Sequence, residues 1–151
     1  MFTTMKAFLG GLTDHPHWPI IGTHVPPYME KANLDFLREA MGIEYEERQI
    51  KNVDIDPDTV KSGDFLGIMR LDGAGSLIMY GTGSRVGHNV MALRFDGVLY
   101  IVESTDGPGY ANGIQRTPWA KWMKDANQFD YLVTYHRLND EARAKFDEKK
   151  A

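Results

Sequence analysis

The dipeptide Asp96-Gly97 constrains the fold of this sequence more than any other feature, because it stands between two apolar runs. These runs cover residues 89–95 and 98–104. Asp-Gly in such a setting is the strongest short-range signal for a β-hairpin closed by a two-residue turn. That turn pairs Phe95 with Val98, and the pairing of every other residue in the hairpin then follows from it.

The same register brings two polar side chains together near the open end of the hairpin. His88 and Glu103 fall on one face as a diagonal pair, roughly 7 Å apart at the backbone. The face between them is apolar, with Val90, Ala92 and Ile101. At this separation Glu103 can accept from one ring nitrogen of His88 and leave the other free as a base. The plainer alternative is that His88 ends its strand and Glu103 is an exposed polar residue.

A helix is predicted before the strand-rich part of the chain. Leu34, Leu37 and Met41 follow helical spacing, Pro27 suits the first turn, and Gly42 suits the end. Further strands are predicted from their β-period patterns. They cover residues 64–71, 77–80 and 131–136.

A second helix is predicted with Thr117 as its N-cap and Pro118 at its first position. Its apolar face would contain Trp119, Trp122, Met123 and Ala126. Helices flanking a run of strands predict an α+β fold. The chain divides into an N-terminal arm, a domain and a charged C-terminal segment that is either a lightly packed helix or a solvated tail. These parts cover residues 1–27, 28–137 and 138–151.

Composition excludes several classes of function. The length of 151 residues fits one domain, and a net charge of −4 gives no basic surface for nucleic acid or anionic membranes. No apolar run approaches the roughly 18 residues of a membrane span. The absence of cysteine excludes disulfides, thiolate metal sites and a cysteine nucleophile within these residues. Without cysteines or a leader segment, we expect a cytoplasmic protein with no cofactor.

Three short motifs have simpler interpretations than a ligand site. The histidines at 15, 17 and 24 suggest a metal cluster, but polar loop residues are the preferred interpretation. An acidic run beginning at Asp54 lacks the glycine and glutamate of a calcium loop, so it is read as an ordinary loop. Residues 81–87 are rich in glycine but misplace the third glycine of a nucleotide-binding loop, and no helix is predicted to follow.

Two longer segments carry a family resemblance. They read VKSGDFLGIMRLDG at residues 60–73 and YGTGSRVGHNVMALRFDGVLYIVES at residues 80–104. Together they resemble the NlpC-type papain-like cysteine hydrolases, including the circularly permuted branch. The matching motifs are Gly63-Asp64 at the start of a strand, Gly87-His88 at a later strand, and Glu103 on the next. GIQRTPWAKW, from residue 113, is similar to a stretch in uncharacterised eukaryotic and protist relatives.

The resemblance implies a papain-like domain with a curved antiparallel sheet that acts on an amide or ester bond. A thiolate at a helix N-terminus would attack the carbonyl, with His88 as the base and Glu103 as its orienter. Gly83, Ser84 and Gly87 would line the substrate groove. Ser84 and Thr82 carry the only nearby hydroxyls that could substitute for a thiol.

The sequence departs from the family because it contains no cysteine. Either the nucleophile lies beyond residue 151, or the domain has lost it. The first hypothesis is a hydrolase- or acyltransferase-type domain that keeps the His88–Glu103 dyad and is inactive as this chain. The alternative is a non-catalytic binding or structural domain that uses the same groove. The partner would be an unidentified small molecule, peptide or lipid.

Overall fold

The fold is an antiparallel sheet with helices packed on it, which confirms the α+β prediction. The computed structural model describes residues 25–45, 52–105 and 113–151. Within these ranges five strands form one sheet in the order β4-β3-β2-β1-β5, with antiparallel neighbours throughout. The elements are α2 (Pro27–Met41), the short 3₁₀ turn η1 (Pro57–Thr59), β1 (Phe65–Met69), α3 (Gly73–Thr82), β2 (His88–Phe95), β3 (Val98–Thr105), β4 (Gly113–Pro118), α4 (Trp119–Gln128), β5 (Leu132–His136) and α5 (Asp140–Lys145).

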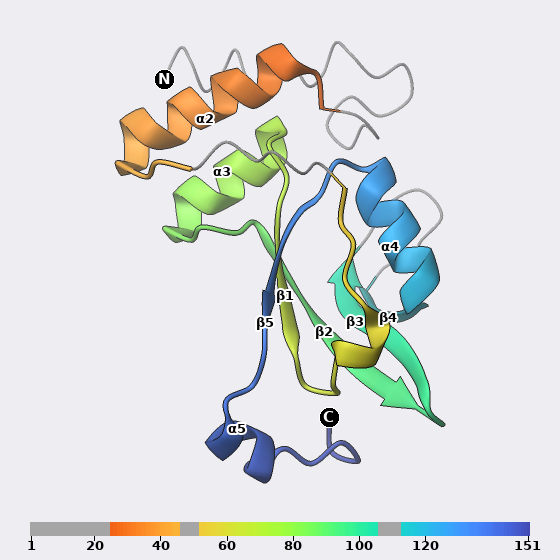
Figure 1. Cartoon of the computed structure of the whole chain (residues 1–151). Coiled ribbons are helices and arrows are strands. Elements are labelled where there is room, and N and C mark those ends of the chain that lie inside the picture. The colour runs from red at the N-terminus through yellow and green to blue at the C-terminus, as the bar shows by residue number, and fades with distance from the viewer. Residues whose placement is uncertain (1–24, 46–51, 106–112) are drawn as a thin grey trace.

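The helices lie at different places around the sheet (Figure 1). α2 and α3 lie together at one end, α4 lies beside the sheet, and α5 lies at the opposite end. The described residues form two apolar clusters. One joins α4 to alternate residues of the sheet, and it contains Val60, Leu66, Ile68, Val90, Ala92, Leu99, Ile101, Trp119, Trp122 and Ala126. The other joins α2 and α3 to the end of β1, and it contains Val25, Met29, Phe36, Leu37, Met69, Leu71 and Met79.

The predicted hairpin is present with the predicted register. Phe95 lies opposite Val98, and the pairing continues to Met91 opposite Val102. Asp96 and Gly97 have φ values of 50° and 81°, so both occupy the left-handed region. A two-residue turn with two positive φ angles matches the right-handed twist of its strands, which is why Asp-Gly closes the hairpin tightly.

The predicted first helix is also confirmed. Pro27 is the first residue of α2, and Gly42 ends the helix with a φ of 65°. Of the predicted stripe, Leu37 is fully buried, while Leu34 and Met41 pack at the edge of the second cluster.

Residues 77–80 were predicted as a strand, and this prediction is wrong. They belong to α3, whose N-cap is Asp72. The Asp72 side chain accepts a hydrogen bond of 2.6 Å from the backbone N–H of Gly75. This bond satisfies one of the free donors at the helix start, so Asp72 stabilises a helix over the segment that follows it. The apolar run Leu77–Tyr80 was ambiguous because a run this short has no clear period.

The helix boundary predicted at Thr117 is wrong as well. Thr117 lies in β4, where it is buried opposite Ile101, and α4 begins two residues later at Trp119. The predicted apolar face of α4 is nevertheless confirmed. Trp119, Trp122 and Ala126 are buried, and Met123 packs against them. Proline suits both the end of an edge strand and the start of a helix, so Pro118 did not distinguish the two positions.

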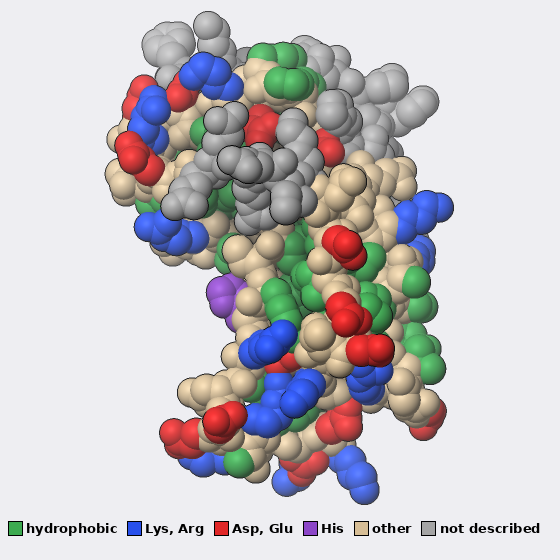
Figure 2. All heavy atoms as spheres, in the orientation of Figure 1, with side chains coloured by type: hydrophobic (Ala, Val, Ile, Leu, Met, Phe, Trp, Pro, Cys, Tyr) green, Lys and Arg blue, Asp and Glu red, His purple; other side chains and the backbone are tan. Residues whose placement is uncertain are grey.

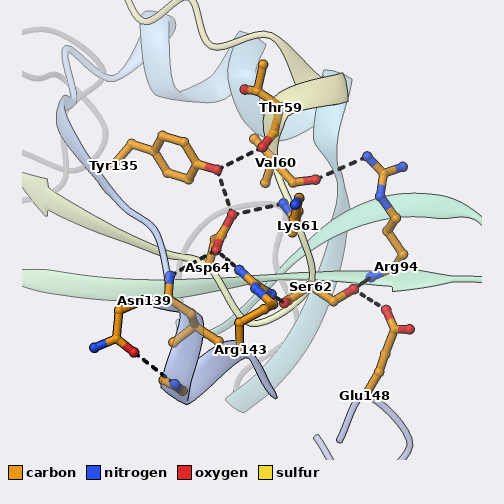
Figure 3. A network of polar contacts seen from close by, with 12 residues as sticks. Thr59, Val60, Lys61, Ser62, Asp64, Arg94, Tyr135, Asn139, Arg143 and Glu148 are labelled. Carbon is orange, nitrogen blue, oxygen red and sulfur yellow. Dashed lines mark hydrogen bonds and ion pairs between the residues drawn. The ribbon is translucent and has the colours of Figure 1, made fainter. Parts of the chain in front are cut away.

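The C-terminal segment is anchored to the start of β1 by the buried carboxylate of Asp64 (Figure 3). The carboxylate accepts hydrogen bonds from the Tyr135 hydroxyl at 2.6 Å, the Lys61 N–H at 2.9 Å and the Leu138 N–H at 3.2 Å. Arg143 of α5 forms an ion pair with the same carboxylate. This segment is therefore a docked helix and not a solvated tail.

Two further hydrogen bonds and a close apolar contact hold this end of the molecule. Arg143 also donates to the backbone carbonyl of Ser62, and the Ser62 hydroxyl donates to Glu148. The side chains of Leu138 and Phe146 lie so close to Gly63 that a Cβ there would collide with them. Charged side chains of both signs gather over this lower end of the surface (Figure 2).

The environment of Asp64 changes its titration. Burial alone would raise its pKa, but the hydrogen bonds from Tyr135, Lys61 and Leu138, together with the charge of Arg143, outweigh burial and lower the pKa. The same contact raises the pKa of Tyr135, through burial first and then through the hydrogen bond and charge of Asp64. Both shifts favour the ionised carboxylate paired with a neutral phenol.

We predict that Asp64→Asn destabilises the fold and weakens its acid sensitivity. A carboxylate with a lowered pKa stabilises the folded state above its unfolded pKa, and this contribution is lost as the pH falls through the folded value. Breaking the buried pair should lower the free energy of unfolding by about 3 kcal/mol near neutral pH. Urea unfolding at about pH 7 and about pH 3 measures both effects.

Asp54→Asn is the matched control, because Asp54 is exposed. Its free energy of unfolding should stay within about 0.5 kcal/mol of the unsubstituted protein. Equal losses in the two variants would contradict the assigned role of Asp64.

Candidate functional site

His88 is positioned by the first residues of β2. The backbone N–H of Gly87 donates to the Ile68 carbonyl at 2.9 Å, and His88 itself lies opposite Ile68 of β1. Because side chains alternate along a strand, His88 points to the same side as Val90 and Ala92, which belong to the α4 cluster. The imidazole lies at the edge of that cluster, with its side chain 35% exposed.

Glu103 meets His88 as the hairpin register predicts. The Nε2 atom of His88 lies 2.8 Å from the Oε2 atom of Glu103. The Glu103 side chain is only 7% exposed, so its carboxylate is nearly withdrawn from water. The plainer alternative placed Glu103 in solvent, and this placement is wrong. A buried carboxylate requires a hydrogen-bond donor, and His88 supplies it.

The contact determines which ring nitrogen can do chemistry. An ionised carboxylate only accepts hydrogen bonds, so the proton of this bond belongs to Nε2 of His88. In the neutral ring Nδ1 then carries the lone pair and is the atom that can accept a proton. If Nδ1 takes up a proton, the imidazolium stands directly against the negative charge of Glu103. The pair therefore has the arrangement of a base and its orienting acid.

The predicted groove residues lie in the connection from α3 to β2. Gly83 ends α3 with a φ of 67°. The Ser84 hydroxyl accepts a hydrogen bond of 3.1 Å from the Val86 N–H. Gly87 packs against Gly75, where an added Cβ would lie 3.3 Å from the Gly75 carbonyl oxygen. These contacts account for the local backbone, and a Cβ at Gly87 would need a small shift of the Gly75 backbone.

The two nearby hydroxyls are used by the backbone of this connection. Thr82 donates to the Ile78 carbonyl at 2.7 Å within α3, and Ser84 holds the following turn. Neither residue sits on a strained strand-to-helix turn of the kind that exposes a serine nucleophile.

The glycine segment is equally unsuited to phosphate. Gly83 caps the C-terminus of α3, and the chain continues into β2. A helix C-terminus carries partial negative charge and repels phosphate. Among the described residues, no three histidine or acidic side chains converge on a possible metal position. The histidines at 15, 17 and 24 lie outside the described residues.

A polar residue that the sequence analysis missed faces Glu103 from the next strand. Gln115 of β4 lies directly opposite Glu103 in the antiparallel register. Its Nε2 atom is buried and has no hydrogen-bond partner within the described part of the chain. The segment at 114–117 does not alternate apolar and polar residues, and only its β-branched Ile114 and Thr117 favour a strand.

Comparison with known proteins adds no assignment. No family model matches the chain, and no curated protein or solved structure shows significant similarity to it. Among the helices of the described segments, none has the length and apolar character needed to cross a membrane.

We predict that Glu103 fixes the tautomer of His88. In the unsubstituted protein the neutral ring should be almost entirely the Nε2–H form, because Glu103 accepts from Nε2. Glu103→Gln offers an amide that can both donate and accept, so both tautomers should become populated. Long-range ¹H–¹⁵N spectra of the imidazole measure the two forms directly.

His136 provides the matched control, since it is an exposed histidine whose Nε2 contacts only the Thr134 hydroxyl among the described residues. Its ring signals should not respond to Glu103→Gln. An unchanged tautomer at His88 would show that the acid does not orient the ring.

Proposed function

We propose that this chain is a papain-like, NlpC-type domain whose site is built for acyl transfer from an amide or ester. The observation that carries the proposal is the 2.8 Å contact between His88 Nε2 and Glu103 Oε2. It is supported by the motifs Gly63-Asp64 and Gly87-His88, which stand at the starts of β1 and β2. The α+β architecture with an antiparallel sheet is compatible with it.

In such a reaction His88 would act through Nδ1. It takes the proton from a thiol as the sulfur forms a bond to the carbonyl carbon, and Glu103 stabilises the resulting imidazolium. The imidazolium then returns the proton to the leaving nitrogen or oxygen as the bond to the carbonyl carbon breaks. Water then gives a proton to His88 as its oxygen bonds to the carbonyl carbon, the carbon–sulfur bond breaks, and the sulfur regains the proton as the carboxylic acid leaves.

The 151 residues contain no thiol, so they cannot perform the covalent step themselves. Thr82 and Ser84 do not replace it, because the Thr82 hydroxyl bonds to the backbone of α3 and the Ser84 hydroxyl to the backbone of the following turn. We therefore assign to this chain the base and its orienter and no turnover of its own. This same observation favours the second candidate, a domain that binds an acyl compound at the site without reacting with it.

We predict that the chain binds acyl compounds at His88 without turning them over. Activated esters and amides should be hydrolysed no faster by the protein than by His88→Ala, with His136→Ala as the matched control. A small amide such as N-acetylglycine methylamide should still shift the ring signals of His88 at millimolar concentration. Release of product and the imidazole ¹⁵N signals are the two measurements.

Hydrolysis that disappears only in His88→Ala would contradict the assignment of an inactive site. Ring signals that no amide or ester moves would contradict an acyl-binding site altogether.

A further inference from the structure

The two faces of β4 differ in what they present. Ile114 is 84% exposed, and Arg116 also lies on the surface. Thr117 and Gln115 occupy the opposite face of the same strand, and Thr117 is buried opposite Ile101 of the α4 cluster. Gln115 therefore projects to the side of the sheet that holds Glu103 and His88.

Gln115 lies close to Glu103. Directly opposite residues of an antiparallel pair have Cβ atoms roughly 4.5–5.5 Å apart, and both side chains have the length to span that gap. Oε2 of Glu103 contacts His88. The described residues give Oε1 no hydrogen-bond donor.

The side-chain amide of Gln115 lacks a hydrogen-bond acceptor among the described residues. Its Nε2 is buried and makes no hydrogen bond, and buried polar atoms without a partner are uncommon in folded proteins. Among the described residues, a buried amide donor without an acceptor thus stands across the strand pair from a carboxylate oxygen without a donor. The terminal torsion of glutamine is soft, so rotation about it can turn the amide donor toward the carboxylate.

We propose that Gln115 is a positioning residue that donates from Nε2 to Oε1 of Glu103. The inference rests on the proposed function, because it assigns Gln115 to the same site. A carboxylate held at both oxygens cannot rotate, so Oε2 keeps its direction toward His88 and Nδ1 keeps its orientation. Gln115 thereby completes the chain Gln115–Glu103–His88.

The residue type fits this role. A lysine or arginine opposite Glu103 would neutralise its charge and compete with His88 for the carboxylate. An acidic residue there would repel it. Glutamine donates without charge, so the negative charge of Glu103 remains available to the imidazolium.

The test compares Gln115→Met, which keeps the length of the side chain and removes the donor, with Gln128→Met at the exposed end of α4. If Gln115 holds Glu103, Gln115→Met lowers the midpoint of thermal unfolding. It also speeds exchange of the His88 Nε2 proton with water several-fold and increases the Nδ1–H tautomer. Gln128→Met changes none of these. If Gln115 stays unpaired, the methionine removes an unsatisfied polar group, the unfolding midpoint rises, and the His88 signals do not change.

A measurement on the unsubstituted protein covers the case in which Gln115→Met does not fold. The side-chain amide protons of Gln115 should be protected from exchange, and Glu103→Ala should remove that protection. Exchange as fast as at the exposed Gln128 would overturn the inference.

Glu103→Gln separates this inference from the proposed function. If the tautomer of His88 changes in Glu103→Gln but not in Gln115→Met, the role of Gln115 is contradicted and the His88–Glu103 dyad is retained. If the tautomer of His88 stays unchanged in both variants, the role of Gln115 and the role of the dyad are both contradicted.

Discussion

The turn at Asp96-Gly97 is the constraint on which the rest of the molecule depends. Two consecutive residues in the left-handed region form the whole turn, so Phe95 pairs directly with Val98. A shift of one position would move every side chain of a strand to the other face. His88 would then leave the apolar face that α4 covers, and Glu103 would lose the donor that makes its burial tolerable. The fold and the site share this one geometric origin.

Besides the His88–Glu103 pair, a second polar centre forms around Asp64, at the end of β1 away from His88. Asp64 collects donors from the start of β1, from β5 and from α5, so residues far apart in sequence meet at one carboxylate. The contrast with Glu103 is physical. Asp64 has several donors and serves to join segments, whereas Glu103 has one donor among the described residues and faces a titratable ring. The first arrangement fixes structure, and the second leaves a ring nitrogen available for proton transfer.

The candidate site illustrates how far local reasoning reaches. The His88–Glu103 contact was predictable, because both residues belong to one hairpin whose register a single turn sets. Gln115 was not, because β4 joins β3 through residues 106–112 and nothing local sets the pairing of those two strands. Pro118, the last residue of β4, suits the start of a helix as well as the end of a strand. The segment at 77–80 failed for a related reason, since the capping bond of Asp72 and packing against α2 decide its helical state.

Elements whose signals are local could be predicted from the amino-acid sequence alone. These are the hairpin, the α2 helix between Pro27 and Gly42, the apolar face of α4 and the lack of any thiol. Each follows from turn chemistry, side-chain periodicity or composition. Three features emerge only in the folded molecule: Asp64 pairs with Arg143, residues 77–80 are helical, and Gln115 faces Glu103. These outcomes depend on contacts between distant segments, whose free energies are set by burial and by the pairing of polar groups once the chain has closed on itself.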